Sequence, residues 1–548
     1  MASRLASEVD YIVVGGGSAG CVVASRLSED ASISVCMLEY GRRNNSALVR
    51  WPAGYAKLQG EKNRYEWMTV PQKHLQNRRI PTPQGKLLGG GSSVNSMVYI
   101  RGNRNDYDNW AELGNDRWSY ADVLSYFRKS EDNERLDDEF HGVGGPLGVS
   151  DQRSPCDLTR MFLRAGQELG YRFNHDFNGT RQAGVGFLQV TQRNVRRCSA
   201  AHAFIYPAES RPNLKVMTGV RVTRVLVENG RAIAVEYAVP GSREPQVVRA
   251  RREVVVSGGA INTPKILLLS GIGPADEIAR HGLKPVHDLP GVGKNLQDHL
   301  SAFTGMRLNK PISYSGQDKG LRAIRHGIEF LMFGTGAITS CVVEGGLFMS
   351  TTGNDLWPDT QMHFIPAGLS MHKEIVGHGI TLAAANLRPQ SRGEVALASG
   401  DFRDEPLIDP KFLSEEPDLR RNIDGIKAAR ELLHTRAFSS VFQSEESPGP
   451  DIRTDKEIGK YVREVAKTDF HPVGTCKMGS DKMAVVDQDL KMHGLEGLRV
   501  IDASVMPAII SGNTNAASIM IGERGADAIL GRRLSPAISD PRPATVAS

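Results

Sequence analysis

The chain lacks the features that mark several large classes of protein. Its six cysteines are scattered and form no C-x-x-C pair, which argues against a disulfide framework or a zinc site and for a reducing compartment. No run approaches the roughly 18 apolar residues of a transmembrane helix, and residues 1–10 contain no apolar stretch like that of a signal peptide. We therefore expect a cytoplasmic protein without a transmembrane segment, and leave peripheral attachment to the inner membrane open.

Strong charge and abundant aromatic residues are also missing. The net charge is only +5 over 548 residues, and Lys and Arg are mixed with acidic residues rather than clustered. This pattern does not indicate a nucleic-acid-binding surface. Aromatic residues make up 6% and hydrophobic residues 40% of the chain, which is the composition of a globular protein long enough for two or more domains.

A nucleotide-binding pattern occupies the start of the chain. Residues 10–14 read as a short buried strand, residues 15–20 as a G-x-G-x-x-G turn, and residues 21–27 as a helix. A second strand over 33–38 ends in Glu39, 19 residues after Gly20. This order of elements is typical of a dinucleotide site.

Each part of this pattern has a physical task. Gly15 permits the tight turn, Gly17 lets the backbone approach a pyrophosphate, and Gly20 allows close contact between helix and strand. The helix N-terminus offers N–H groups and positive potential to phosphates, and Glu39 can accept hydrogen bonds from a ribose hydroxyl. The alternative is a glycine-rich structural loop.

Later segments predict a second structural unit. A further glycine cluster at residues 85–93 is suited to wrapping an anionic or polar ligand, and residues 211–237 read as a β-hairpin or meander. A short helix over 265–269 is expected after Thr263-Pro264. Alternating segments between about residues 300 and 460 predict a mostly antiparallel sheet.

Two segments near the surface have distinctive patterns. Residues 321–333 predict an amphipathic helix with Ile324, Ile328, Leu331 and Met332 on one side. We expect this helix to pack in the core, with a lid or a membrane-surface helix as alternatives. Residues 532–548 are rich in Pro, Ser and Ala and predict a disordered tail.

Four motifs in order make the chain resemble the glucose–methanol–choline (GMC) family of FAD-dependent oxidoreductases. They are the nucleotide loop, residues 85–102, residues 259–273, and a C-terminal pair at residues 471–475 and 502–516. Together they cover the chain from residue 10 to about 530. The chain resembles bacterial alcohol and choline dehydrogenases of the family, and segments 197–200, 476–479 and 493–497 are particularly similar to L-sorbose dehydrogenase.

The resemblance implies an α/β fold (α+β overall). A Rossmann-like FAD-binding domain is interleaved with a substrate-binding domain built on a mostly antiparallel sheet. The expected FAD-binding domain comprises residues 8–155, 205–300 and 465–531. The expected substrate-binding domain comprises residues 156–204 and 301–464.

FAD is the cofactor that the resemblance implies, and no metal is expected. Some relatives bond the flavin through a His where this chain has Val94, so we expect FAD to be held non-covalently. Tyr40 departs from the family pattern and either stacks near the adenine or simply packs. The residues that the resemblance assigns to FAD binding are Gly15, Gly17, Ser18, Ala19, Gly20, Glu39, Tyr40, Trp67, Leu88, Gly89, Gly91, Ser92, Asn95, Ser96, Met97, Val98, Val222, Asp502, Ala503, Asn513 and Thr514.

Oxidation of an alcohol removes a hydroxyl proton and a hydride from the same carbon. The resemblance implies hydride transfer to flavin N5 with His471 as the general base, a role that suits imidazole because its pKa lies near operating pH. It also makes Asn515 the second active-site residue, which would hydrogen-bond the substrate oxygen. A structural N-cap role for residues 513–515 is the alternative. A helix over 516–528 would direct its positive end towards the flavin.

Other polar residues have roles that the motifs leave open. Glu344 is expected to line the substrate cavity, with a structural salt bridge as the alternative. Asp469 is expected to approach the flavin. The remaining histidines considered are expected to make structural hydrogen bonds; they are His141, His287, His299, His363 and His493.

The leading hypothesis is an FAD-dependent dehydrogenase of a primary alcohol, sugar or polyol. Sorbose is the first substrate expected and a medium-chain or aromatic alcohol the second. Choline is disfavoured because the chain has few aromatic residues that could enclose a quaternary ammonium. The electron acceptor is left open between a quinone-like molecule and O2, with dehydrogenase favoured over oxidase. A hydroxynitrile-lyase-like FAD protein is the alternative of a different class. The patterns do not indicate an oligomeric state.

Overall fold

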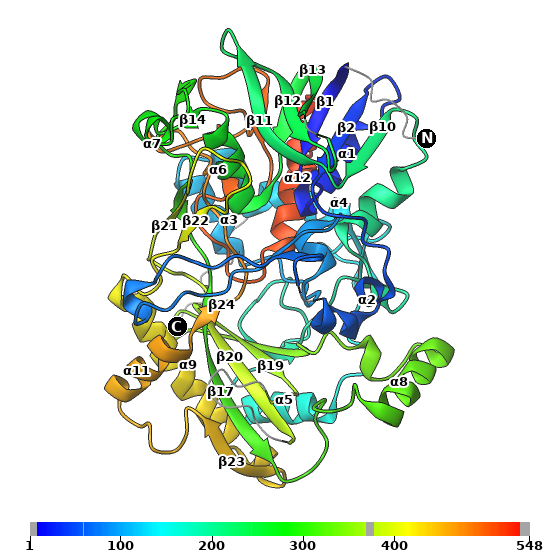
Figure 1. Cartoon of the computed structure of the whole chain (residues 1–548). Helices are drawn as coiled ribbons and strands as arrows, with labels where there is room; N and C mark the ends of the chain where they lie inside the picture. Colours follow the sequence, from blue (N-terminus) through cyan, green and yellow to red (C-terminus); the bar gives the residue numbers. More distant parts are fainter. Residues whose placement is uncertain (1–7, 59, 243, 369–376, 538–548) are drawn as a thin grey trace.

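Two β-sheets organise the chain, one in each half of the molecule as drawn in Figure 1. The computed structural model describes residues 8–58, 60–242, 244–368 and 377–537. Each sheet collects strands from widely separated parts of the sequence. The predicted α/β fold with a second, antiparallel sheet is confirmed.

The first sheet has seven strands and is mainly parallel. Strand β1 is buried over all but its first residue, as expected for a parallel strand covered on both faces. Strands β11 and β12 form the predicted hairpin. In spatial order the strands are β10 (Leu214–Thr218), β2 (Val35–Glu39), β1 (Glu8–Val14), β13 (Gln246–Val256), β12 (Arg231–Ala238) and β11 (Arg221–Glu228), with β25 (Leu498–Val500) beside the end of β13.

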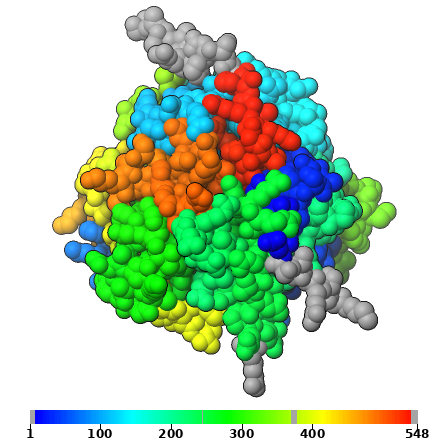
Figure 2. Space-filling view, turned by 90° about the horizontal axis from the view of Figure 1, so that it is seen from above, coloured from blue at the N-terminus to red at the C-terminus, as the bar shows by residue number. Residues whose placement is uncertain are grey.

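Helices from the two ends of the chain pack together next to this sheet. An ion pair joins Arg26 of α1 (Ser18–Leu27) to the buried Glu523 of α12 (Asn515–Ile529), with 2.7 Å between N and O. Figure 2 shows residues near the C-terminus (red) beside residues near the N-terminus (blue) on the upper face. This packing brings the nucleotide loop and the C-terminal motif to one place.

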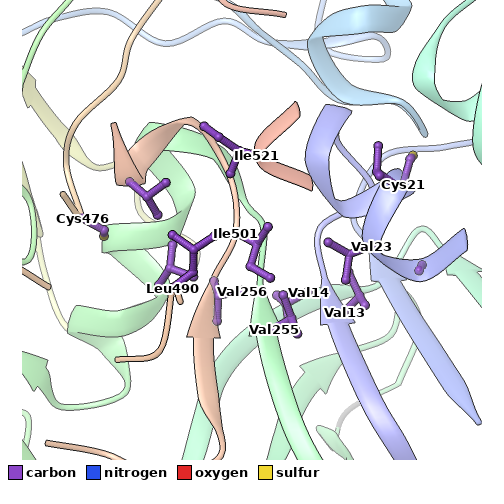
Figure 3. Close-up of a cluster of buried hydrophobic side chains, with 14 of the residues drawn as sticks. Val13, Val14, Cys21, Val23, Val255, Val256, Cys476, Leu490, Ile501 and Ile521 are labelled. Atoms are coloured by element: carbon purple, nitrogen blue, oxygen red, sulfur yellow. The ribbon is translucent and has the colours of Figure 1, made fainter. Parts of the chain in front are cut away.

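The core beneath these helices is apolar. Val13 and Val14 of β1 lie in one cluster with Val255 and Val256 of β13 and with Ile501, which follows β25 (Figure 3). All five are 2% exposed or less. Burial of each such side chain stabilises the fold by roughly 1.5–3 kcal/mol, so this cluster holds the strand ends that carry the loop.

The second sheet is antiparallel throughout its recorded pairings. Alternate side chains of β19 and β20 face opposite sides: Met362 and Leu382 pack against α5 (Asp157–Glu168) and α9 (Glu416–Leu433), whereas His363 and Ala383 line a cavity. In spatial order the strands are β23 (Phe442–Ser447), β17 (Leu300–Leu308), β20 (Gly379–Asn386), β19 (Thr360–Ile365), β18 (Gly345–Met349) and β7 (Gly184–Phe187), with β24 (Lys467–Thr468) beside β17. Other helices are α2 (Ala47–Arg50), α3 (Arg104–Glu112), α4 (Tyr120–Ser130), α7 (Ala275–Arg280), α10 (Arg436–Ser439) and α11 (Asp455–Val465).

Helix α6 (Gly259–Leu269) begins at Gly259, so the prediction that it starts at residue 265 was wrong. Pro264 lies inside the helix and has no N–H to donate to the Ala260 carbonyl four residues earlier. The Thr475 hydroxyl donates to that carbonyl instead, at 2.6 Å. The helix continues through the proline because a residue of the C-terminal motif supplies the missing donor.

Two predictions about the surface were wrong. Helix α8 (Gly320–Phe333) forms as predicted, but only Phe330 of its residues is buried, so it is not a core helix. The start of the predicted disordered tail packs on α4, where the Ala537 N–H donates to the Ala121 carbonyl at 3.1 Å and Ser125 donates to the Ser535 carbonyl. Residues 538–548 lie outside the described residues. No described helix is long and apolar enough to cross a membrane.

Candidate active site

The nucleotide loop joins β1 to α1 and is shaped by its glycines. Gly15 has a left-handed φ of 102°, and a Cβ there would lie 2.4 Å from the Ser257 carbonyl oxygen. A Cβ on Gly20 would lie 2.0 Å from the Gly15 carbonyl oxygen. The two glycines therefore permit the tight turn and the close approach of α1 to it.

A cavity of about 1420 Å³ extends from this loop to the second sheet. Its volume exceeds the roughly 300–1,000 Å³ of pockets for drug-sized ligands, which leaves room for a dinucleotide and a second small molecule. Ser18 at the start of α1 and Asn515 at the start of α12 both line it, and neither helix has a side-chain cap. Both N-termini therefore offer N–H groups and positive potential to a ligand.

Most of the residues assigned to FAD binding line this cavity. Val94, where some relatives carry the flavin-linking His, lines it as well, and a valine side chain cannot form that bond. Lining residues that were predicted are Gly15, Gly17, Ser18, Ala19, Glu39, Tyr40, Trp67, Gly91, Asn95, Ser96, Val98, Val222, Asp502, Ala503, Asn513, Thr514, Asn515 and His471.

Five assigned residues do not line the cavity and instead support its wall: Gly20, Leu88, Gly89, Ser92 and Met97. The Gly89 N–H donates to the Gly16 carbonyl at 2.6 Å, and the Ser92 hydroxyl donates back to the Gly89 carbonyl. Leu88 and Met97 are fully buried. Contact of these five residues with FAD stays a prediction; in the glycine cluster Gly90 and Gly91 line the cavity, whereas Leu88, Gly89 and Ser92 do not.

An aromatic row borders the nucleotide end of the cavity. The rings of Tyr65 and Trp67 stack with 4.3 Å between centroids, and Tyr40 follows at 6.1 Å from Tyr65. Glu39 lies beside them, and its carboxylate accepts the Gly16 N–H at 2.7 Å. Burial raises the pKa of Glu39. Tyr40 thus packs against a protein ring and also lines the cavity, and its stacking near the adenine stays a prediction.

Glu344 was wrongly predicted to line the substrate cavity. Its carboxylate is fully buried and accepts hydrogen bonds from the Cys156 N–H at 2.8 Å and from the hydroxyls of Thr159 at 2.6 Å, Tyr314 at 2.7 Å and Ser340. No cation is within ion-pair distance in the described part of the chain, so the salt-bridge alternative was also wrong. Four neutral donors satisfy the carboxylate and tie α5 to the second sheet.

His471 projects into the cavity from a turn after β24. The backbone N–H of His471 donates to Asp298 at 2.9 Å, and Asp298 also accepts from the Thr468 hydroxyl. Burial raises the pKa of Asp298 to about 7. Asp298 therefore holds the backbone that presents the imidazole, through bonds that do not involve the ring.

The ring nitrogens of His471 are assigned by a chain of hydrogen bonds. Nε2 of His299 lies 3.1 Å from the Leu387 carbonyl, which can only accept, so this nitrogen donates. Nδ1 of the neutral His299 ring is then an acceptor, and it lies 3.0 Å from Nδ1 of His471. His471 must donate from Nδ1, which leaves the lone pair on its Nε2.

The neutral forms of both rings are favoured by their surroundings. Burial lowers the pKa of His471 well below its ordinary value, and the positive charges that His299 and His363 would carry lower it further. Burial also lowers the pKa of His299 to about 4. At neutral pH the His471 ring is therefore uncharged, with an unprotonated Nε2 that can accept a hydrogen bond.

The neighbour of that lone pair is Asn513, and the prediction of Asn515 for this place was wrong. Nδ2 of Asn513 lies 3.2 Å from Nε2 of His471, and its Oδ1 accepts from Gln361 at 3.3 Å. Asn515 instead accepts from the Ser18 hydroxyl at 2.8 Å and joins α12 to α1. Asn513 precedes α12 whereas Asn515 is its first residue, so the start of the helix decides which side chain meets the base.

Sequence reasoning missed several residues around His471. His299 and His363 were expected to be structural, yet His299 bonds the base and His363 lines the cavity. Lys467 also lines it, with Nζ 4.7 Å from the centroid of Phe303. The available signal was the polar run of residues 297–299 between Leu296 and Leu300. His141, His287 and His493 make only structural hydrogen bonds, as predicted.

Asp469 lines the cavity close to these histidines, and it was expected to approach the flavin. The Ser301 hydroxyl donates to its carboxylate, and its own N–H donates to the His299 carbonyl at 2.9 Å. Burial raises the pKa of Asp469. The base, two further histidines, a lysine and a carboxylate thus meet at the end of the cavity away from the nucleotide loop.

The cavity has the features that FAD requires, and comparisons with known proteins agree. The two GMC oxidoreductase family models match residues 9–301 and 389–522. The chain is 42% identical over 529 residues to an alcohol dehydrogenase (acceptor) of Pseudomonas putida, covering 95% of each chain. It is 41% identical over 538 residues to an oxygen-dependent choline dehydrogenase of Cronobacter sakazakii, covering 96% of each.

Solved structures show the same architecture. Pyridoxine 4-oxidase from Mesorbium loti has a TM-score of 0.87 and 29% identity, over 96% of this chain and 100% of that one. A variant of formate oxidase from Aspergillus oryzae RIB40 has a TM-score of 0.89 and 26% identity, over 96% and 99%. With both family models matching in the expected order and relatives more than 40% identical over nearly the whole chain, the chain belongs to the GMC oxidoreductase family.

Proposed function

We propose that this protein is a dehydrogenase of primary alcohols that carry an apolar chain or ring, with His471 as the base and Asn513 as its partner. As a GMC oxidoreductase it binds FAD and oxidises CH–OH groups. The observation that carries the proposal is the series of contacts from the Leu387 carbonyl through His299 to His471, which leaves the Nε2 lone pair beside Asn513.

The chain's own residues position and deprotonate the alcohol. A hydroxyl oxygen in contact with both Nε2 of His471 and Nδ2 of Asn513, which lie 3.2 Å apart, would give its proton to the imidazole and accept an N–H from the amide. When FAD is bound in the cavity, the chemistry that it would supply is acceptance of the hydride from the carbinol carbon. The alcohol loses one proton and one hydride, and a carbonyl product remains.

The wall opposite the nucleotide loop favours an apolar substrate. Phe303, Ala383 and Ile365 of the second sheet line the cavity, beside the polar side chains of His363 and Lys467. A sugar or polyol such as sorbose, the first substrate expected from the sequence, would need more hydrogen-bonding partners there. A medium-chain or aromatic alcohol, the second expectation, fits this wall better.

Choline is disfavoured for a structural reason. A quaternary ammonium binds over aromatic faces, but the ammonium group of Lys467 already lies over Phe303 at 4.7 Å from its centroid. A second cation at this ring would be repelled. Asp469, the carboxylate nearby, is engaged by Ser301.

Anaerobic reduction of the bound flavin tests the proposal. We expect octanol or benzyl alcohol to bleach the visible flavin band near ~450 nm rapidly, and sorbose, sorbitol and choline to do so slowly. Fast bleaching by sorbose or choline alone would overturn the substrate class. Absence of bleaching by every alcohol would favour the hydroxynitrile-lyase-like alternative, which needs no net redox change.

The electron acceptor is proposed to be a quinone-like molecule rather than O2. The name of the Pseudomonas putida relative specifies an acceptor without naming oxygen. Hydrogen peroxide formed in proportion to oxidised alcohol in air, with no stimulation by a quinone or dye, would contradict this choice.

Replacing Asn513 and replacing Asn515 should have different effects. Asn513→Ala removes a donor from the reacting oxygen, so the rate constant of flavin reduction should fall by about 10²–10³-fold. Asn515→Ala removes only the bond to Ser18, which is worth about 1 kcal/mol, and should lower FAD affinity or stability with little effect on that rate constant. Stopped-flow reduction and FAD titration measure the two effects. A larger loss of rate in Asn515→Ala would restore the sequence-based assignment.

The rate of flavin reduction should stay high in mildly acidic solution. The pKa of His471 is lowered well below 6.5, and only the neutral form, which predominates above the pKa, accepts the hydroxyl proton. As pH falls, the rate should therefore remain level through 6.5 and decline only where His471 becomes protonated. A pH series of anaerobic reduction measures this. A half-maximal rate near 6.5 would show that the site leaves the histidine unperturbed.

A further inference from the structure

Helix α8 presents its apolar side to solvent. Leu321 is 84% exposed and Met332 is 71% exposed, and Ile324, Ile328 and Leu331 are also more than half exposed. In Figure 1 the helix stands out at the edge of the lower half of the molecule. Exposed apolar residues occur singly on most surfaces, but a contiguous group marks a binding surface.

The exposed residues form one continuous stripe. At about 100° per residue, these five side chains fall within an arc of roughly 100° on the helix. The opposite side faces the protein, where Phe330 is buried against Trp51 and Arg196. This is the reverse of an ordinary surface helix, whose apolar stripe faces the core. We call the five residues the α8 stripe.

Positive charges border the α8 stripe. Lys319, Arg322 and Arg325 are exposed, and no carboxylate of the described residues lies within 4.0 Å of any of them. The neighbouring acids are already engaged, because Asp318 pairs with Lys57 at 3.3 Å and Glu329 lies 3.6 Å from His326. An apolar stripe with unpaired cations on one side and at its N-terminal end matches the boundary between acyl chains and anionic headgroups.

The helix also borders the cavity. Ala323, His326 and Gly327, on its inner side, line the cavity, and so do the exposed residues Gly316 and Asp318 just before it. The cavity therefore reaches the surface beside α8. A surface that engages this helix would lie next to one entrance of the active site.

We propose that α8 binds the surface of an anionic lipid bilayer, with the α8 stripe in the acyl boundary and the three cations at the headgroups. A second copy of the chain fits less well, because a symmetric contact would bring the same unpaired cations together. This placement would let amphiphilic alcohols and a lipid-soluble acceptor reach the cavity from the bilayer, a consequence that rests on the proposed function.

Vesicle binding by the full-length FAD-loaded protein tests this proposal without any turnover. We expect it to cosediment with vesicles of equal phosphatidylglycerol and phosphatidylcholine, and less with phosphatidylcholine alone. The variant L321Q/I328Q/M332Q should lose cosedimentation. The variant R322Q/R325Q should bind the anionic vesicles about fivefold more weakly for each cation removed, and added salt should weaken the wild type similarly.

A matched control changes three exposed apolar residues elsewhere. The variant L113Q/V143Q/V286Q removes side chains that are likewise exposed and should bind vesicles like the wild type. Retained FAD absorbance in each variant shows that it is folded. Wild type that remains in the supernatant, or stripe and control variants that bind equally, would overturn the proposal. A wild-type dimer that the stripe variant converts to a monomer, without vesicle binding, would identify a second copy as the occupant and also overturn it.

Discussion

His471→Gln should slow anaerobic flavin reduction by an alcohol by about 10²–10⁴-fold while leaving bound FAD in place. The structure supports this expectation because Nε2 of His471 is the unprotonated nitrogen at the cavity, beside Asn513 at 3.2 Å. A glutamine side chain can still hydrogen-bond but cannot accept the hydroxyl proton at neutral pH. The measurement is stopped-flow bleaching of the visible flavin band with saturating alcohol.

A matched variant tests whether the loss is specific. His287→Gln replaces a histidine whose Nε2 lies 2.9 Å from the His493 carbonyl and which does not line the cavity. The flavin of His287→Gln should be reduced by the alcohol at the wild-type rate. Equal rates in His471→Gln and the wild type would rule out proton abstraction by this residue and favour a protein in which FAD has another role.

Gly20→Ala should give a folded chain that binds FAD about 5- to 150-fold more weakly, the range that corresponds to a distortion of about 1–3 kcal/mol. The added Cβ would lie 2.0 Å from the Gly15 carbonyl oxygen and 3.1 Å from the Ser257 side chain. Either α1 or the turn must therefore shift, although Gly20 itself does not line the cavity. FAD titration of the apoprotein, followed by flavin fluorescence, measures the loss.

Gly459→Ala provides the comparison for this substitution. A Cβ at Gly459 would lie no closer than 3.4 Å to another side chain, and the residue lies within α11 and does not line the cavity. FAD affinity should therefore stay at the wild-type level. Unchanged affinity in Gly20→Ala would mean that the loop tolerates the shift and that the packing of α1 on the turn is not what shapes the FAD site.

The two sets of variants address different parts of the protein. The loop glycine acts on cofactor binding through backbone packing, whereas His471 acts on the chemical step through one lone pair. The effect of Gly20→Ala should appear in the affinity for FAD, measured without substrate. The effect of His471→Gln should appear in the rate of flavin reduction, measured with FAD saturating. A variant that changes both would indicate that the loop and the base are linked through α12, whose start contacts α1 at Ser18.

The sequence by itself determined the elements that depend on contiguous residues. The strand, glycine turn, helix and Glu39 of the nucleotide site lie within one short segment, where backbone geometry and spacing leave few alternatives. The hairpin of β11 and β12, the alternation in β19 and β20, and the helix at the C-terminal motif were predictable for the same reason. His471 was found because it lies within a motif of the family.

Only the tertiary structure decided which side chains meet. Asn513 and Asn515 are two residues apart, and the place where α12 begins turns one to His471 and the other to Ser18. Glu344 is surrounded by four donors from separate segments, and His299, just before β17, reaches His471 although it is far away in sequence. The α8 stripe faces solvent because Phe330, on the other side, is the residue that packs. Local sequence patterns determine whether a segment forms a helix or a strand. The direction of a side chain depends on contacts between segments that are distant in the sequence, and residue spacing does not show these contacts.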